Sequence, residues 1–314
     1  MAIPCILDCD PGHDDAIAML LAAAHPAIDL RAITTVAGNG PLDKVTLNAR
    51  KVCTLAGLLD VPIAAGAAGP SEGKLDAAID VHGESALDGP ELPDPEVELD
   101  GRPAAELIAD ALRDADEPLT ILATGPLTNI AEVVGSGGNL GGLREIVWMG
   151  GSTERGNRTP YAEFNAWVDP PAVAAVLASG VPFTMVGLNL THQALATQEV
   201  VAGMRALGTP VGDTVAGWLT YFGDNYRNLF GFSDPPVHDP CAVALVAEPD
   251  VVRCVDAFVA AETEGRWTRG ATVVDLAGRL GRPANARVAV ELDVPRFWQI
   301  VTAAVQTFRS GAPA

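Results

Sequence analysis

ILDCDPGHDDA, residues 6–16, is the stretch that decides the fold, because it joins a predicted strand to a predicted helix. The short apolar run at residues 3–7 predicts a buried strand, residues 8–13 a turn, and residues 14–24 a helix. Asp14 and Asp15 fall in the first helical turn, where the helix dipole favours negative charge. A buried strand followed at once by a helix is typical of a parallel sheet.

The same alternation of strand and helix patterns continues along the first two thirds of the chain. Predicted strands occupy residues 30–36, 119–123, 145–149 and 183–186, and predicted helices occupy residues 43–58, 103–115, 127–134 and 170–179. Such an alternation favours strands that lie parallel under a cover of helices. The sequence therefore predicts an α/β fold with a mostly parallel central sheet flanked by helices, an open Rossmann-like architecture.

The last third of the chain has a different pattern. Helices are predicted at residues 198–207, 214–229 and 295–308, and strands with hairpin-like spacing at residues 251–262, 271–276 and 287–292. We therefore expect a few extra C-terminal strands in the sheet. No internal repeat or linker divides the chain, which predicts a single domain over residues 1–314. A long, polar, turn-rich loop at residues 70–95 is typical of a functional or disordered segment.

Charge and composition exclude several classes of partner. The 314 residues carry 40 acidic and 20 basic side chains, a net charge of −20 at pH 7. Nucleic acids and anionic lipids reward a basic surface, so we expect no nucleic-acid partner and no membrane partner. The longest apolar helical run, residues 16–24, is far shorter than the roughly 20 residues that a bilayer requires. No secretory signal is evident, which favours a cytoplasmic protein.

Four carboxylates crowd the turn after the first predicted strand: Asp8, Asp10, Asp14 and Asp15. Open α/β sheets bind ligands at the carboxyl ends of their strands. Crowded carboxylates repel one another unless a cation or raised pKa values relieve them. Their hard oxygen atoms suit Ca²⁺ or Mg²⁺ better than zinc. An EF-hand loop does not fit, because its sixth position would be His13 in place of glycine.

The chain resembles the inosine–uridine preferring nucleoside hydrolases, whose N-terminal signature is similar to DCDPGHDDA at residues 8–16. Six further blocks follow in the family's order: VAGN at 36–39, VHGESALDG at 81–89, ATGPLTN at 123–129, WMGG at 148–151, AEFNAWVD at 162–169 and VHDPC at 237–241. Two positions depart from the family pattern. Ala86 stands where the family usually has glycine, and Cys9 stands where threonine is common.

The resemblance implies a nucleoside hydrolase, which cleaves the N-glycosidic bond of a ribonucleoside with water and releases free base and ribose. It implies one Ca²⁺ held by carboxylates of Asp10, Asp15 and Asp239 and by the backbone carbonyl of Thr124. Asp10 is expected to be the general base. His238 is expected to protonate the departing base, since histidine has a pKa suited to proton transfer near neutral pH.

The resemblance also implies the residues that grip the substrate. Amides and carboxylates are natural partners for ribose hydroxyls. The matching positions are Asp14, Asn39, Asn157, Glu163 and Asn165, with Met149 packing near the sugar. His82, in the long loop, is expected to close over the base. Tyr226 is the aromatic residue of the helix at 214–229 that we expect to reach the base, together with His238.

Two alternatives to the hydrolase remain open on sequence grounds. A non-catalytic ribose- or nucleoside-binding protein on the same scaffold would be expected to lack a metal ligand or the base, yet Asp10, Asp15 and Asp239 are all present. A DxD-type phosphotransferase or phosphatase usually carries threonine or valine where this chain has Gly12. The resemblance implies as partners a small nucleoside, of inosine or uridine type with broad base preference, and further copies of the chain in a homodimer or homotetramer.

Overall fold

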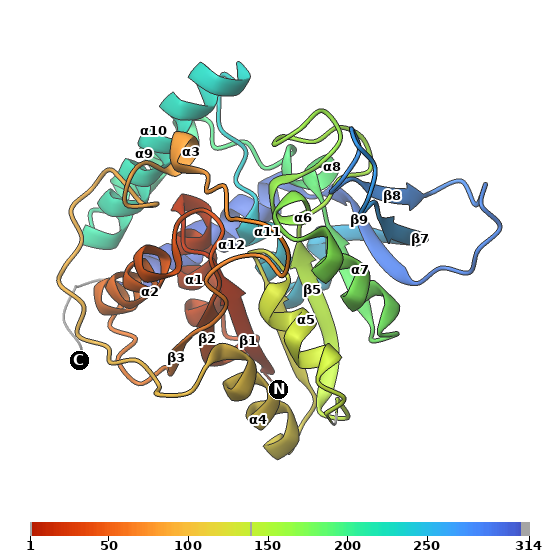
Figure 1. Cartoon of the computed structure of the whole chain (residues 1–314). Helices are drawn as coiled ribbons and strands as arrows, with labels where there is room; N and C mark the ends of the chain where they lie inside the picture. The colour runs from red at the N-terminus through yellow and green to blue at the C-terminus, as the bar shows by residue number, and fades with distance from the viewer. Residues whose placement is uncertain (1, 139, 309–314) are drawn as a thin grey trace.

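The sheet of the computed structural model, which describes residues 2–138 and 140–308, has nine strands in the order β3-β2-β1-β4-β5-β6-β9-β7-β8 (Figure 1). The first six strands in this order, from β3 through β1 to β6, lie parallel to one another. Strand β9 is parallel to β6. Strand β7 runs antiparallel to β9, and β8 runs antiparallel to β7. The mostly parallel sheet with extra C-terminal strands that the sequence predicts is therefore confirmed.

The elements follow in the order expected from the sequence. The strands are β1 Ile3–Cys9, β2 Ile28–Thr35, β3 Ile63–Ala65, β4 Leu119–Ala123, β5 Leu143–Met149, β6 Phe183–Val186, β7 Val252–Ala261, β8 Thr272–Asp275 and β9 Ala286–Leu292. The helices are α1 His13–Ala24, α2 Leu42–Ala56, α3 Ile79–His82, α4 Ala104–Asp114, α5 Thr128–Gly135, α6 Phe164–Val168, α7 Pro170–Ala178, α8 Leu188–Thr191, α9 Gln198–Ala206, α10 Pro210–Phe230, α11 Asp239–Ala247 and α12 Val294–Thr307, with a 3-10 turn at Pro249–Val251.

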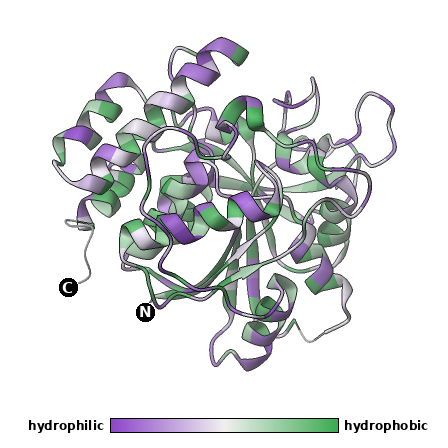
Figure 2. Ribbon diagram, turned by 60° about the vertical axis from the view of Figure 1, so that its left-hand side comes forward, coloured by the Kyte–Doolittle hydropathy of each residue, from purple (hydrophilic) through white to green (hydrophobic). Residues whose placement is uncertain are grey.

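Helices cover both faces of the sheet and enclose two apolar cores. One core packs α1, α2, α11 and α12 against the sheet, and the other packs α4, α5 and α7 against it (Figure 1). Figure 2 shows hydrophobic residues gathered in the central strands and hydrophilic residues on the outer helices. Helix α11 is buried at every position, as a helix in the middle of a core must be. Among the described residues, no helix is long and apolar enough to span a bilayer.

Several short elements were not predicted. Strand β3 has three residues, and α3 and α8 have four each, so they are too short to show a periodicity. The predicted helix at residues 214–229 begins earlier, at Pro210, because the Thr209 hydroxyl accepts a hydrogen bond from the amide of Gly212. Helix α11 was missed because DPCAVALVA is apolar on all sides and has no helical period.

The strand order places the functional loops. From β1 the chain moves outward to β2 and β3, and it then crosses back to β4 on the other side of β1. Such a reversal opens a crevice at the carboxyl ends of the two central strands. Asp10 follows β1 and Thr124 follows β4, so both lie at this crevice.

Candidate active site

A cavity of about 240 Å³ lies at the carboxyl edge of the sheet. This volume lies just below the range of roughly 300–1,000 Å³ that is typical of ligand pockets, and it suits one small molecule. Every substrate-binding residue predicted from the sequence lines it: Asp14, Asn39, His82, Met149, Asn157, Glu163, Asn165, Tyr226 and His238. The expected metal ligands Thr124 and Asp239 line it as well.

Asp10 and Asp15 lie behind this wall. Both contact Asn39, whose backbone amide donates to Asp10 Oδ2 at 2.7 Å and whose side-chain amide donates to Asp15 Oδ2 at 3.0 Å. The Thr124 hydroxyl donates to Asp15 Oδ1 at 2.8 Å, and the Gly12 amide donates to Asp15 Oδ2 at 3.1 Å. The loops after β1, β2 and β4 are therefore tied together through these two carboxylates.

A carboxylate cluster forms where α1 and α11 begin. Asp14, Asp15 and Asp239 each offer an oxygen within 4.8 Å of the others, and all three are buried. Burial raises the pKa of each one, and the neighbouring carboxylates raise the pKa values of Asp14 and Asp239 further. Asp14 also accepts a hydrogen bond from the backbone amide of His238 at 3.2 Å. A cation would relieve the repulsion within this cluster.

The environment of Asp10 also fits a cation. Its Oδ1 atom is buried and has no hydrogen-bond partner within residues 2–138 and 140–308. Burial and the Asp15 carboxylate raise the pKa of Asp10 well above its usual value. A Cβ atom on Gly38 would lie 2.1 Å from Asp10 Oδ2, and one on Gly125 would lie 2.8 Å from Oδ1. The glycines of VAGN and ATGPLTN therefore leave room for this carboxylate.

Polar groups suited to ribose hydroxyls lie on one wall of the cavity. Glu163 caps α6 and accepts from the backbone amides of Gly151, Asn165 and Ala166 at 2.8–3.1 Å. The Asn165 side chain donates to the carbonyl oxygen of Thr124 at 2.7 Å and to that of Met149 at 3.0 Å. Burial raises the pKa of Glu163 to about 7 despite these amide donors. These side chains are held rigidly by the backbone around them.

Aromatic side chains and a histidine form another part of the cavity lining. His238 Nε2 lies 2.7 Å from the Tyr226 hydroxyl, and Nδ1 lies 2.7 Å from the Thr191 hydroxyl. Burial lowers the pKa of His238 well below its usual value and raises that of Tyr226 well above its own. Tyr226, expected to reach the base, thus lies against the cavity with its hydroxyl joined to His238. Phe164, Phe222 and Phe230 complete the apolar surface.

The long loop at residues 70–95 contributes α3 to the lining of the cavity. Ala78, Asp80, Val81 and His82 line the cavity, and the side-chain amide of Asn225 on α10 donates to the Val81 carbonyl at 2.8 Å.

Arg158, which the sequence did not single out, also lines the cavity. It forms ion pairs with Asp76 and Asp80 of the long loop, the latter at 3.8 Å. No local signal marks it, because its partners are remote in sequence.

The two departures from the family pattern have clear positions. Ala86 adopts a left-handed backbone with φ +64°, the only positive φ of a non-glycine residue in the described chain, which explains why glycine is usual there. Cys9 is buried in the apolar core, and its thiol donates to the carbonyl oxygen of Thr34 at 3.5 Å. It therefore points away from the carboxylate cluster.

A sheet of this topology, with a carboxylate cluster at its switch point beside a pocket lined by amides and aromatic rings, defines an enzyme that acts on a small polyhydroxylated ligand. The chain belongs to the inosine-uridine preferring nucleoside hydrolase family, whose model matches residues 5–299. The chain is therefore a nucleoside hydrolase acting on ribonucleosides. This assignment replaces the two alternatives left open by the sequence, a nucleoside-binding protein and a phosphotransferase.

Relatives in sequence and structure agree with this assignment. The chain is 43% identical to the pyrimidine-specific ribonucleoside hydrolase RihA of Enterobacter sp. (strain 638), over 98% of this chain and 99% of that one. It is 45% identical to the same-named enzyme of Citrobacter koseri, over 95% and 96% of the two chains. Its fold is similar to that of a purine-preferring ribonucleoside hydrolase from Gardnerella vaginalis, with a TM-score of 0.91, 29% identity and coverage of 98% and 99%.

Proposed function

We propose that this chain hydrolyses the N-glycosidic bond of ribonucleosides in a Ca²⁺-dependent reaction, and that it accepts both pyrimidine and purine bases with pyrimidines preferred. The observation that carries the proposal is the cavity itself, in which a carboxylate cluster, an amide wall and a hydroxyl–histidine pair converge. Relatives at 43–45% identity are named pyrimidine-specific, which supports the order of preference.

The Ca²⁺ would be held by Asp10, Asp15, Asp239 and the carbonyl oxygen of Thr124. Asp14 is close enough to the Asp15 and Asp239 carboxylates to join them. All these donors are oxygen atoms, which is the ligand set that Ca²⁺ prefers. When bound, the cation would orient a water molecule and lower its pKa. The buried Oδ1 of Asp10, which has no hydrogen-bond partner among the described residues, is the atom suited to take the proton of that water.

The ribose would lie between the cluster and the amide wall. Asn39, Asn157, Glu163 and Asn165 present acceptors and donors at fixed positions, so they can hold the sugar hydroxyls and orient the C1′ atom. The sugar gains positive charge as the glycosidic bond breaks. Buried carboxylates beside it stabilise this charge more strongly than they could in water.

The base would lie against Phe222 and Tyr226. The Thr191 hydroxyl can donate to His238 Nδ1, His238 Nε2–H can donate to the Tyr226 oxygen, and the Tyr226 hydroxyl can then give its proton to the base. Protonation makes the nucleobase a better leaving group. The contacts thus favour Tyr226 as the group that gives its proton to the base, with the Nε2–H of neutral His238 stabilising the phenolate oxygen that is left.

A hydrolysis panel tests this function. Release of base from uridine, cytidine, inosine, adenosine and guanosine, and of nitrophenolate from p-nitrophenyl riboside, is measured before and after chelation. We expect turnover of uridine and inosine, its loss in the chelated enzyme and its return with Ca²⁺. Full activity of protein shown by elemental analysis to be metal-free would overturn the Ca²⁺ requirement. Equal turnover of all five nucleosides would overturn the pyrimidine preference.

A further inference from the structure

Residues 72–80 of the long loop form an exposed arm beside the cavity. Six of its nine residues are exposed, and Ala78 is the one that is buried. A hollow of about 330 Å³ is lined by the first part of this arm together with Trp167, Val168 and Arg269. Close packing would leave no such space, so packing alone does not hold the arm in place.

Arg158 supplies the ion pairs of the arm. Its guanidinium pairs with Asp76 and with Asp80, the latter at 3.8 Å, and it lies over the Trp167 ring, 5.0 Å from the centroid. Apart from hydrogen bonds within the turn of α3, the arm makes no other hydrogen bond or ion pair in the part of the chain that the structure describes. One side chain therefore provides the polar attachment of nine residues.

Hydrogen bonds fix the chain on either side of the arm. Ser71 donates to the buried carboxylate of Asp169, and the Val81 carbonyl oxygen accepts from the Asn225 side chain at 2.8 Å. Between these two points the attachment is electrostatic and depends on Arg158. Attraction between partly exposed charges is screened by ions in solution, whereas buried hydrogen bonds are screened far less.

The same ion pairs join two parts of the cavity lining. Arg158 lines the cavity next to Asn157, and its partner Asp80 lines the cavity from the arm. Val81 and His82, which also line the cavity, follow Asp80 directly in the chain. Release of Asp80 would open the cavity on this side. It would also leave an unpaired carboxylate beside a cavity that already contains several.

We propose that Arg158 is a positioning residue whose ion pairs hold the arm at the cavity, so that nucleoside affinity falls as ionic strength rises. The inference rests on the proposed function for its ligand and goes beyond it in naming the contact that controls access. An exposed ion pair changes an equilibrium by up to about fivefold. Since Arg158 acts through the arm, its loss should change KM and leave kcat as it is.

The position of the arm is tested without substrate by a lysine-specific endoproteinase. The chain has three lysines, of which Lys44 and Lys51 lie in α2 and Lys74 lies in the arm. When opening and closing are fast, the rate of cleavage at Lys74 follows the fraction of detached arm. Arg158→Gln should be cleaved there about fivefold faster than the wild type at low salt.

Salt provides a test that needs no variant. Between about 0.01 M and about 1 M NaCl the screening length falls from about 30 Å to about 3 Å, so wild-type cleavage at Lys74 should accelerate toward the rate of Arg158→Gln. A peptide of residues 70–80 corrects for the effect of salt on the protease. Wild-type cleavage that did not change with salt would overturn the proposal even if Arg158→Gln did not fold.

Kinetics test the effect on the substrate. At low salt Arg158→Gln should raise KM for uridine and inosine about fivefold with kcat unchanged, and Arg158→Lys should recover part of the loss because it keeps the charge. Arg269→Gln is the matched control, because Arg269 lines the same hollow but donates to the backbone carbonyl of Trp167 at 3.5 Å. A fall in kcat with KM unchanged would overturn the proposal. If the wild type hydrolysed no nucleoside, the proposed function would fail, while cleavage at Lys74 would still test the arm.

Discussion

Single atoms around Asp10 explain much of the site. Gly38 and Gly125 pack against its carboxylate, the Asn39 amide holds one oxygen, and the other oxygen has no partner in the described chain. A buried carboxylate oxygen without a partner is costly unless a proton or a cation satisfies it. The sequence named Asp10 as base and ligand. The three carboxylates whose oxygen atoms lie within 4.8 Å of one another are Asp14, Asp15 and Asp239, so the role of Asp10 as a ligand stays a prediction.

The first prediction concerns Asp10→Asn. The amide keeps an oxygen that can bind a cation but cannot take a proton, so kcat for uridine should fall by roughly 10²–10⁴-fold. Nucleoside binding, measured by isothermal titration, should persist. Asp213→Asn, at an exposed position of α10, is the matched control. Near-native turnover of Asp10→Asn would show that another group accepts the proton.

A second prediction separates proton donation from substrate grip. Tyr226→Phe and His238→Ala both break the chain of hydroxyl, imidazole and base, so each should lower kcat/KM for inosine and uridine by about 10²-fold. The p-nitrophenolate group leaves without protonation, so p-nitrophenyl riboside should be hydrolysed almost as before. Both substrates are measured in both variants. A loss of equal size on the two would assign the pair to sugar binding or to folding.

At the scale of elements, Asp169 holds the long loop against helices α5 and α7. It caps α7 through the Ala172 amide at 3.1 Å and accepts from the backbone and hydroxyl of Ser71 and from the Thr128 hydroxyl, at 2.6–2.8 Å. These bonds join the start of the 70–95 loop to α5 and α7. The carboxylate is fully buried, so its loss would leave several donors without a partner.

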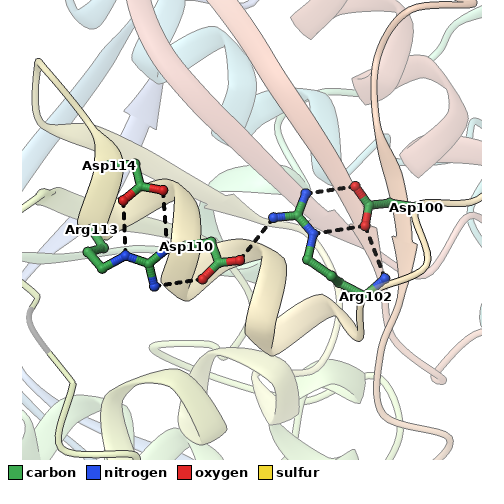
Figure 3. A network of polar contacts seen from close by, with 5 residues as sticks. All are labelled: Asp100, Arg102, Asp110, Arg113 and Asp114. Carbon is green, nitrogen blue, oxygen red and sulfur yellow. Dashed lines mark hydrogen bonds and ion pairs between the residues drawn. The ribbon is translucent and has the colours of Figure 1, made fainter.

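Exposed ion pairs along and just before α4 contrast with the buried carboxylate of Asp169. Figure 3 shows Arg102 between Asp100 and Asp110, and Arg113 between Asp110 and Asp114, with bonds of 2.7–3.1 Å. The Arg102 guanidinium lowers the pKa of the Asp110 carboxyl group. The carboxylates beside Arg102 in turn raise the pKa of its guanidinium. Such exposed pairs are screened by water and salt, so good geometry there contributes little stability.

The third prediction compares these two settings. Asp169→Ala should lower the free energy of unfolding by about 3 kcal/mol, because hydrogen-bond donors become buried without an acceptor. It should also raise KM for uridine, since the loop that carries His82 loses its anchor. Asp114→Ala should leave the unfolding midpoint almost unchanged. The small shift that remains should be larger at low salt than at high salt. Thermal and denaturant unfolding measure both variants, and similar midpoints for the two would contradict this role of Asp169.

At the scale of the whole molecule, the charge of the acidic surface and the charge of the buried carboxylates both depend on pH. Burial raises the pKa of Asp14 to about 7, from an ordinary value near 3.8. A carboxyl group with a raised folded pKa releases its proton more readily in the unfolded state. The metal-free protein should therefore lose stability as pH rises from about 4 to about 7.

The fourth prediction follows from this linkage. Ca²⁺ binds the deprotonated carboxylates of the folded protein, so it should raise Tm more at pH 8 than at pH 5. At a free concentration 100 times Kd the gain would be about 2.7 kcal/mol. Thermal unfolding with chelator and with Ca²⁺ at the two pH values measures it. No gain at pH 8 would argue against a cation site in the cluster.

The homodimer or homotetramer and the cytoplasmic location expected from the sequence stay predictions, and light scattering of the purified protein tests the first.

The sequence by itself determined the α/β class, the order of the longer strands and most helices, and eleven of the eighteen residues that line the cavity. The elements follow from local patterns, whereas the cavity residues were implied by the resemblance of short motifs to those of the nucleoside hydrolases. Strand and helix periodicities span a few residues, and ligand-binding motifs sit directly after strands, as VAGN follows β2 and ATGPLTN spans the end of β4.

Only the tertiary structure decided which of these residues meet. Helix α11 carries Asp239 to the first turn of α1, where the His238 amide meets Asp14 across 224 positions. The same packing joins Tyr226 to His238 and brings His13 against His82. Such contacts arise when two apolar helices pack against one sheet at a particular register. No periodicity within either segment encodes how the two helices pack, so the side-chain hydrogen bonds and the carboxylate grouping emerge only once the core is formed.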